Sequence, residues 1–319
     1  MLIPRLVVCV FSVGIMIFGA GPVAGQQYPN KLIRIVTAQT GGTIDFGARL
    51  LAQAISGPLG QPVIVDNRGV IAAEVVAKAP PDGYTLVYYT SSLWLAPFLR
   101  DSVPWDPVKD FAPISLTDKS PSLLVVHPSL PTHSVKELIA LAKARPGELN
   151  YARASVGSST QLSAELFKTM AGVNIVSIPY KGGGPALIGL IGGQVHLMFS
   201  PAGSVVPHLK SGKLRALAVT SAEPFAQFPQ LPTVAASGLP GYESITVVGM
   251  FAPAGTPAPI INRLNKEIVQ SLQRADVKEK FLGVGVEPVG SSPEQFAAVV
   301  KSEMVKWGKV IKNSGMRDE

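Results

Sequence analysis

The segment LIRIVTAQTGGTIDFGARLLAQAI, residues 32–55, places a strand pattern directly before a helical pattern, with a glycine-bearing loop between them. Leu32–Thr37 is a short, mainly apolar run rich in β-branched residues, which predicts a buried strand. Apolar residues at helical spacing predict a helix from about Thr43 to Ile55. A strand followed by a helix is the repeating unit of α/β folds, so this segment predicts that fold class.

The same alternation of strand and helix patterns continues for most of the chain. It favours mainly parallel sheets that are flanked by helices. Further strands are predicted at Pro62–Asp66, Tyr84–Tyr89, Ser122–His127, Ile175–Ile178, Val195–Phe199, Leu214–Thr220 and Ile245–Phe251. Three helices have recognisable start signals: the capping-box patterns Ser134–Glu137 and Ser292–Gln295, and the dipeptide Thr256-Pro257.

The first 25 residues have the pattern of a secretory signal peptide. Arg5 precedes the uncharged run LVVCVFSVGIMIFGA, and small residues follow it up to a predicted cleavage after Gly25. The alternative is an uncleaved membrane anchor. Cleavage would remove Cys9, the one cysteine of the chain, so the mature protein would have no disulfide and no thiolate.

The length of the chain predicts two lobes. Cleavage at Gly25 would leave 294 residues, which is beyond the size at which a single hydrophobic core usually stops growing. The proline-rich stretches Pro104–Pro121 and Phe228–Pro240 are the expected points at which the chain passes between lobes. The net charge of +7 is dispersed along the chain with few aromatic neighbours, so no nucleic-acid partner is expected.

Patterns typical of an active site or a metal site are missing from the sequence. It contains no G-x-S-x-G, H-E-x-x-H, Walker or G-x-G-x-x-G motif. The four histidines, at positions 127, 133, 196 and 208, lie in separate predicted elements at no ligand-like spacing. A hydrolase that uses Ser158 as nucleophile is an alternative, but no base is evident. We therefore expect no enzyme activity, no cofactor and no metal.

Two polar loops that join a strand to a helix are the candidate binding elements. In the first, Gly41 and Gly42 allow close approach of a ligand to the backbone, beside the free amides of a helix start. A plain helix start is the alternative, with Thr43 as N-cap and Asp45 facing the helix dipole. The candidate ligand-binding residues of this loop are Gln39, Thr40, Gly41, Gly42, Thr43 and Asp45.

The second loop, YARASVGSST at residues 151–160, leads from a short strand into the predicted helix Gln161–Ala171. Its candidate ligand-binding residues are Ser155, Ser158, Ser159 and Thr160, whose hydroxyls lie beside helix-start amides. Ligands of open α/β sheets bind beyond the carboxyl ends of strands, so the two loops are expected to share one cleft. Two capped helices with no ligand are the alternative.

Seven short motifs occur in order along the chain: YPNKLIRIV (28–36), LGQPVIVDNR (59–68), PDGYTL (81–86), DPVKDFAP (106–113), PYKG (179–182), GGQV (192–195) and GKLRALAVT (212–220). In these motifs the sequence from Tyr28 onwards resembles the extracytoplasmic solute receptors of tripartite tricarboxylate transporters, also called the Bug family.

The resemblance implies a type II periplasmic binding fold, in which two lobes close on a ligand about a hinge. It implies lobe I at residues 26–124 and about 229–319, lobe II at 125–228, and C-terminal helices that pack across both. The two polar loops would form a pincer on a ligand carboxylate. Further cleft residues implied by the family are Ser91, Ser92, Pro179 and Tyr180.

The resemblance also implies a function. The protein would be a monomeric periplasmic receptor of a Gram-negative bacterium that delivers a small organic acid to a tripartite tricarboxylate-type permease. A ligand-sensing module for a membrane signalling partner is the alternative. The sequence departs from its relatives at Thr40, where proline is usual, after Gly69, where about four residues are missing, and at Ser200, where many relatives have aspartate. Ser200 is expected to disfavour an amino-acid ligand.

Overall fold

The computed structural model describes residues 28–317 of the chain. The predicted signal peptide, residues 1–25, and Cys9 lie outside the described residues. The fold is α/β, as the sequence predicts: helices flank one curled mixed sheet whose strand order is β2-β1-β3-β9-β4-β7-β5-β6, with β10 and β8 also paired to β4. The ten strands of the described part are β1 Ile33–Thr37, β2 Val63–Asn67, β3 Thr85–Thr90, β4 Phe111–Val126, β5 Asn150–Arg153, β6 Val176–Pro179, β7 Leu197–Pro201, β8 Arg215–Val219, β9 Ile245–Pro253 and β10 Glu287–Pro288.

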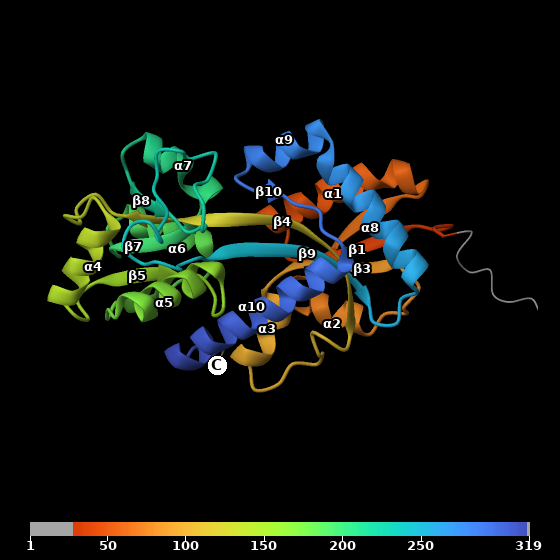
Figure 1. Cartoon of the computed structure of the whole chain (residues 1–319), viewed down its shortest axis with the longest axis horizontal. Helices are drawn as coiled ribbons and strands as arrows, with labels where there is room; N and C mark the ends of the chain where they lie inside the picture. Colours follow the sequence, from red (N-terminus) through yellow and green to blue (C-terminus); the bar gives the residue numbers. More distant parts are fainter. Residues whose placement is uncertain (1–27, 318–319) are drawn as a thin grey trace, which may run out of the picture.

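Helices cover the sheet at both ends of the elongated molecule (Figure 1). The helices of the described part are α1 Thr43–Leu59, α2 Ala72–Ala77, α3 Ser92–Leu99, α4 Val135–Ala144, α5 Ser159–Ala171, α6 Gly183–Ile191, α7 Ala202–Lys210, α8 Ala258–Gln273, α9 Ala275–Gly283 and α10 Pro293–Ser314, with a short 3-10 turn at Gly69–Ile71. Two groups of elements result: the β1 group (β1–β3, α1–α3, α8, α9 and β10) and the β5 group (β5–β8 and α4–α7).

The strands are parallel within each group and antiparallel where the groups join. β1 pairs in parallel with β2 and β3, and β5 pairs in parallel with β6 and β7. The long strands β4 and β9 are antiparallel to each other and extend from one group to the other (Figure 1). β4 pairs with β9 in its first part and with β7 and β8 in its last part.

β4 is longer than the sequence predicts. Only Ser122–His127 was expected as strand, because prolines in the preceding stretch predict loop. The strand begins at Phe111 and includes Pro113 and Pro121. Its register against β9 shifts after Pro113 and again before Asp118. Prolines are accepted at such irregularities and on strands with little pairing on one side, and opposite β9 this part of β4 pairs only with the two-residue β10 among the described elements.

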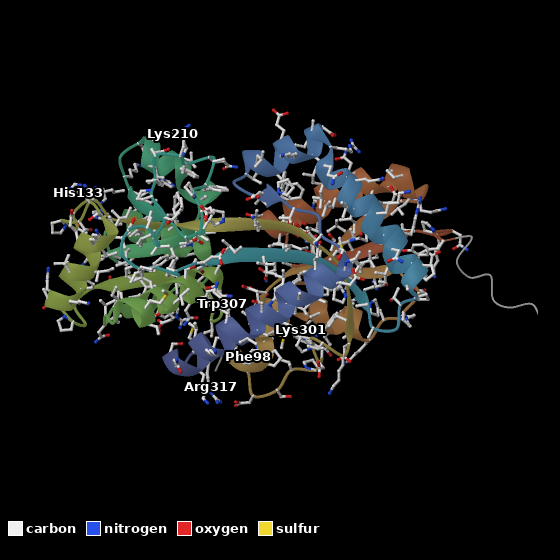
Figure 2. The ribbon with its side chains drawn as sticks, viewed as in Figure 1. Phe98, His133, Lys210, Lys301, Trp307 and Arg317 are labelled. Carbon is white, nitrogen blue, oxygen red and sulfur yellow. The ribbon has the colours of Figure 1, made fainter. Side chains whose placement is uncertain are left out.

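The long helix α10 contacts both groups, because it packs against α3 of the β1 group and against α5 of the β5 group. Trp307 of α10 is buried, and its indole nitrogen donates to Glu303 at 2.7 Å. A methyl group at Gly308 would lie 2.9 Å from the Phe98 ring of α3, so these helices approach closely. Figure 2 shows Trp307 and Phe98 on this face of the molecule.

Helices begin at all three predicted starts, with variations in the caps. α8 begins directly after Thr256-Pro257, with Pro257 as its N-cap and no side-chain cap. Ser292 and Gln295 form the complete capping box at α10. At α4 the Ser134 hydroxyl accepts from the Glu137 amide at 3.2 Å, but the Glu137 carboxylate accepts from the amide of His133 rather than from that of Ser134. Both arrangements satisfy amides that lack intrahelical partners.

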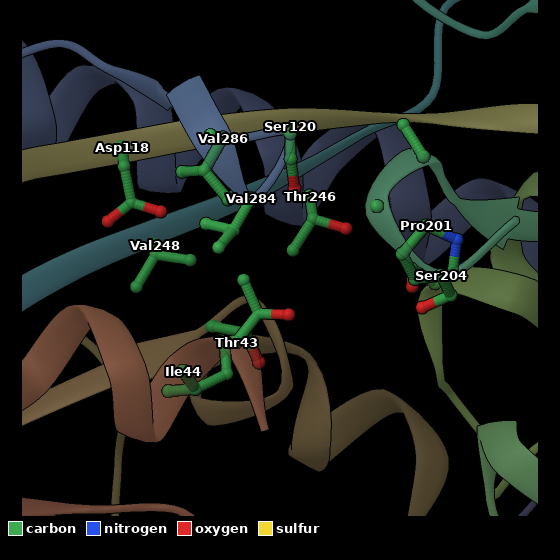
Figure 3. Close-up of a pocket in the computed structure, with 16 residues that line it drawn as sticks. Thr43, Ile44, Asp118, Ser120, Pro201, Ser204, Thr246, Val248, Val284 and Val286 are labelled. Atoms are coloured by element: carbon green, nitrogen blue, oxygen red, sulfur yellow. The ribbon is translucent and has the colours of Figure 1, made fainter. Parts of the chain in front are cut away.

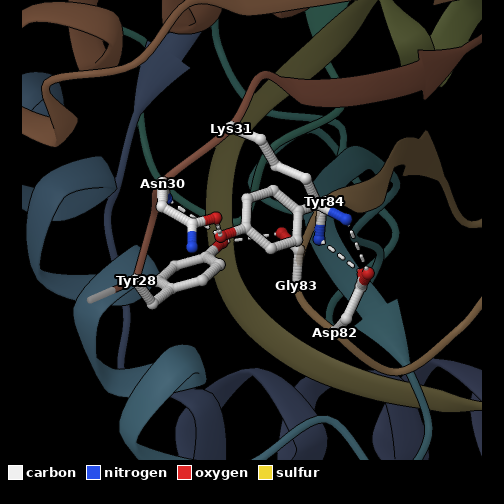
Figure 4. A network of polar contacts seen from close by, with 6 residues as sticks. All are labelled: Tyr28, Asn30, Lys31, Asp82, Gly83 and Tyr84. Atoms are coloured by element: carbon white, nitrogen blue, oxygen red, sulfur yellow. Dashed lines mark hydrogen bonds and ion pairs between the residues drawn. The ribbon is translucent and has the colours of Figure 1, made fainter. Parts of the chain in front are cut away.

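The first described residues are fixed to the turn before β3 (Figure 4). The Tyr28 hydroxyl donates to the Gly83 carbonyl at 2.6 Å, and the Asn30 side chain accepts from the Tyr84 hydroxyl at 2.8 Å. Lys31 pairs with Asp82 at 3.3 Å. Gly83 has φ +80°, and a methyl group there would lie 2.4 Å from Ile260. Glycine at this turn therefore meets a steric and a conformational requirement.

Candidate functional site

A cavity of about 470 Å³ lies where the β1 group and the β5 group face each other (Figure 3). Its walls come from the starts of α1, α5 and α7, from the middle of β4 and β9, and from the segment between α9 and β10. The residues that line it are Thr43, Ile44, Thr90, Asp118, Ser120, Ser159, Pro201, Ala202, Gly203, Ser204, Thr246, Val248, Gly283, Val284, Gly285 and Val286.

The floor of the cavity is one face of the β4–β9 ladder. Asp118 is opposite Val248 in the register, and Ser120 is opposite Thr246. Side chains two residues apart on a strand point to the same face, so these four side chains form a compact set. Figure 3 shows all four around the same space.

Five hydroxyl side chains line this cavity without a hydrogen-bond partner among the described residues: Thr43, Ser120, Ser159, Ser204 and Thr246. They come from both groups of elements, since Thr43 begins α1 whereas Ser159 begins α5 and Ser204 belongs to α7. A hydroxyl can donate one hydrogen bond and accept others. The set is therefore suited to a ligand with hydrogen-bond acceptors.

Three helices begin at the cavity, and no side chain caps any of them. The N-cap positions are Gly42 for α1, Ser158 for α5 and Pro201 for α7. The first-turn amides of a helix have no intrahelical partner, and the helix dipole adds positive potential at that end. Helix starts of this kind bind anions, carboxylates included.

Asp118 is the one carboxyl group among the lining residues of this cavity, and it is only 3% exposed. Tyr88 donates to its Oδ2 atom at 2.5 Å, and the Thr117 hydroxyl lies 2.9 Å from the same oxygen. Burial raises the pKa of Asp118 to about 7, although the hydrogen bonds from Tyr88 and Thr117 act in the opposite direction. Asp118 therefore exists in both charge states near neutral pH.

The first predicted loop is divided between the cavity and the interior. Thr43 lines the cavity, whereas the buried Asp45 carboxylate accepts from the Gly41 amide at 3.0 Å and from Asn67 at 2.9 Å, and pairs with Arg49 at 3.0 Å. Burial acts to raise the pKa of Asp45, but these partners together lower it. Asp45 thus holds the glycine loop in shape.

Other residues of the first loop line a different hollow. Gln39 and Thr40 border it together with the segment Asn67–Val70. A methyl group at Gly69 would lie 3.2 Å from the Gln39 side chain, so the glycine that follows Arg68 gives that side chain room. For Gln39 and Thr40, contact with a ligand stays a prediction.

The second predicted loop is divided in the same way. Ser159 lines the cavity, but Thr160 is buried and accepts from the Ala154 amide at 3.0 Å. Ser158 bonds to the Thr160 hydroxyl at 2.8 Å, so these two side chains brace the loop. Ser155 lines another pocket, together with Ser92.

The remaining predicted residues lie outside the walls of the cavity. The Ser91 carbonyl accepts from the amides of Trp94 and Leu95 in α3. Tyr180 follows the exposed Pro179, packs against Gly189, and its hydroxyl donates to Gln194 at 3.3 Å. Ser200 is 1% exposed on β7, and its hydroxyl has no partner in the described part of the chain. Ligand contact by these residues stays a prediction.

Several lining residues were not predicted from the sequence. Pro201–Ser204 is a third strand-to-helix turn with glycine and serine, which is the same signal that identified the first two loops. Gly283–Val286 contains a spaced glycine pair that could have marked it. Asp118, Ser120 and Thr246 lie inside strands, where no local pattern distinguishes a binding residue from a structural one.

The β5 group touches the β1 group at the edge of the cavity. A methyl group at Gly203 would lie 2.6 Å from the Val284 carbonyl oxygen, and one at Gly285 would lie 3.1 Å from the Gly203 nitrogen. Beside this contact, Gln227 donates to the Leu282 carbonyl at 2.6 Å. The cavity is therefore bounded on this side by a close backbone contact between the groups.

Within residues 28–317, no cluster of three potential metal ligands occurs, and no helix is long and apolar enough to cross a membrane. A cavity between two groups of elements is a usual location for a small-molecule site. The sequence comparisons agree: residues 47–316 match the Tripartite tricarboxylate transporter family receptor, and the chain belongs to this family of solute-binding receptors, which are not enzymes.

Similar proteins include BugT of Bordetella pertussis, which is 39% identical over 315 residues that cover 96% of this chain and 97% of BugT. Among solved structures, R. palustris Rpa4515 with adipate is 39% identical with a TM-score of 0.81, and the match covers 90% of this chain and 98% of that one. MatC from Rhodopseudomonas palustris with bound malate is 31% identical with a TM-score of 0.76, and the match covers 89% and 100% of the two chains. The predicted family is thus confirmed.

Proposed function

We propose that this receptor captures a small organic acid in the cavity between β4, β9 and the starts of α1, α5 and α7. The observation that supports this most strongly is the convergence of five unpartnered hydroxyls and three uncapped helix starts on one cavity. A carboxylate accepts several hydrogen bonds and is stabilised by the positive end of each helix.

The ligand would bind between two lobes. Lobe I would comprise residues 26–124 and about 229–319, and lobe II residues 125–228, with β4 and β9 as the flexible connection. Thr43 would then contribute from lobe I and Ser159 and Ser204 from lobe II, so that one carboxylate joins the lobes. Closure would remove water from the anion, which strengthens its hydrogen bonds to the protein.

The body of the ligand beyond this carboxylate would be mainly apolar. Ile44, Val248, Val284 and Val286 line the part of the cavity near Asp118. Such a wall suits an aliphatic or aromatic body behind the carboxylate, because burial of apolar surface adds affinity. The adipate and malate of the two similar R. palustris structures are both small carboxylic acids, which supports this class of ligand.

We further propose that the chain is exported by its N-terminal signal peptide, binds its ligand in the periplasm as a monomer, and delivers it to a permease of the tripartite tricarboxylate type. The family of the chain supports this partner. The alternative role is that of a ligand-sensing module. It would use the same cavity, but the ligand-bound receptor would contact a membrane signalling protein instead of a permease.

A thermal-shift screen tests the ligand class. Small mono-, di- and tricarboxylic acids are compared with their uncharged amides on the purified protein. An acid present at about 100 times its dissociation constant stabilises the folded state by about 2.7 kcal/mol, which is a measurable rise in Tm. We expect acids to raise Tm and the matched amides to leave it unchanged. If amides stabilise the protein as well as acids do, the anion site is wrong.

A further inference from the structure

Asp118 lies at one end of the cavity, beside Val248 and away from Ser204 of α7 (Figure 3). It is 3% exposed, its Oδ2 atom contacts Tyr88 and Thr117, and its Oδ1 atom has no partner within residues 28–317. Figure 3 shows the carboxyl group at the end of the cavity beside Val248. A nearly buried carboxyl group with one unpartnered oxygen in a ligand cavity is positioned to bond to a ligand.

The Thr117 hydroxyl is shared between Asp118 and a backbone carbonyl oxygen. The Thr117 hydroxyl lies 2.9 Å from Asp118 Oδ2 and 3.0 Å from the Val248 carbonyl oxygen. A hydroxyl has a single hydrogen, so it cannot donate fully to both oxygens. When it donates to Val248, Asp118 Oδ2 accepts from Tyr88 alone, so the ionised form loses one of its two donors. The geometry therefore accommodates the neutral carboxyl group as well as the ionised one.

The charged side chains around Asp118 do not hold it in one protonation state. Tyr88 on β3 is the titratable side chain in contact with it, and burial raises the pKa of Tyr88 well above its usual value. The adjacent charges Lys119 and Glu287 pair with each other at 3.4 Å. α1 presents Ile44 and β9 presents Val248, and the segment after α9 presents valines, all without charge. The protonation state of Asp118 can therefore change when a ligand binds.

We propose that Asp118 is a specificity residue that binds the second carboxyl group of a dicarboxylate through a shared proton, so that ligand capture takes up a proton. This inference rests on the proposed function, which places the first carboxylate at Thr43, Ser159 and Ser204. Two adjacent carboxylates cannot both remain ionised in a buried site, and one proton between them converts repulsion into a hydrogen bond.

A different ligand would leave Asp118 ionised. An acid with a hydroxyl group at its far end would donate to the free Asp118 oxygen and would bind without taking up a proton. A monocarboxylate with an apolar end would leave Asp118 without a partner and would bind more weakly. The number of protons taken up therefore distinguishes the dicarboxylate from the hydroxy acid, and the affinity distinguishes it from the monocarboxylate.

Isothermal titration calorimetry of the purified protein tests the inference. Linear dicarboxylates such as adipate, and monocarboxylates of equal chain length, are titrated at pH 6 and pH 8.5 in buffers of different ionisation enthalpy. We expect uptake of nearly one proton per dicarboxylate at pH 8.5, and an affinity that falls about tenfold for each pH unit above 7. Monocarboxylates should bind more weakly at pH 6, because they make no bond to Asp118.

The variant Asp118→Asn provides the control, because the amide keeps the size of the side chain and cannot titrate. It should bind dicarboxylates with the same affinity at both pH values and without proton uptake. Dicarboxylate binding without proton uptake by the wild-type protein at pH 8.5 would overturn the inference, and so would full uptake by the variant. Proton uptake measured on the wild-type protein tests the inference even when the Asp118→Asn variant does not fold. If acids bind but none takes up a proton, the proposed function stands and this inference fails; if no acid binds at either pH, both fail.

Discussion

Asp118 is expected to make the stability of the unliganded protein depend on pH. The variant Asp118→Asn removes the titration while keeping a side chain that can accept from Tyr88. In the folded protein burial raises the pKa of Asp118 to about 7, whereas the ordinary value of 3.8 applies to the unfolded chain. The folded state therefore binds the proton more tightly than the unfolded state does.

The sign and size of the effect follow from this difference. A group whose pKa is raised in the folded state contributes stability that is present below pH 3.8 and is lost as the pH rises through 7. The separation of the two pKa values corresponds to about 4 kcal/mol, at about 1.4 kcal/mol per pKa unit. Most of this stability disappears between pH 4 and pH 7.

Urea unfolding of both proteins at half-unit steps from pH 4.5 to pH 8 measures the effect. All other titrating groups are shared, so they cancel in the difference between the two free energies of unfolding. We expect Asp118→Asn to gain about 3 to 4 kcal/mol relative to the unchanged protein across this range. A difference that stays constant with pH would refute a buried, proton-binding Asp118.

Three further changes test other parts of the structure. Ser159→Ala should weaken acid binding roughly 10- to 150-fold, because it removes one hydrogen bond to a charged group. The control Ser155→Ala, in the same loop, should change the affinity measured by calorimetry less than twofold. Equal effects of the two variants would place the site elsewhere. Gly203→Val should separate the two groups of elements and lower acid affinity at least tenfold. The control Gly183→Ala should not, because no atom lies within 4 Å of a methyl group at that position. Unchanged affinity of the Gly203→Val variant would show that the contact between the groups is unimportant for binding. Gly83→Ala should destabilise the fold by about 2 kcal/mol because of its positive φ and the close neighbour, and an unchanged Tm would contradict this.

The sequence predicts the alternation of strands and helices because each element has its own local signal. Leu32–Thr37 and the helix from Thr43 show this, since β1 and α1 begin within a residue of the expected positions. The first part of β4 has no such signal. Its prolines disfavour a strand locally, and pairing with β9 and, at Asp118 and Lys119, with β10 stabilises the extended backbone there.

The binding cavity is predicted in part for the same reason. Loops with glycine and serine before a helix are visible in the sequence, and Thr43 and Ser159 from two such loops do line the cavity. Which hydroxyl of a loop faces inward depends on tertiary contacts, as the bond from the Ala154 amide to Thr160 shows. Asp118 joins the site through the register of β4 against β9, which no local pattern encodes.

A crystal structure of the protein with the acid that stabilises it most in the thermal-shift screen tests the central claim most directly. We predict that the carboxylate lies in the cavity, within hydrogen-bond distance of Ser159 and of the first-turn amides of α1 or α5. Density for the acid outside this cavity, or a carboxylate that points away from the helix starts, would contradict the account.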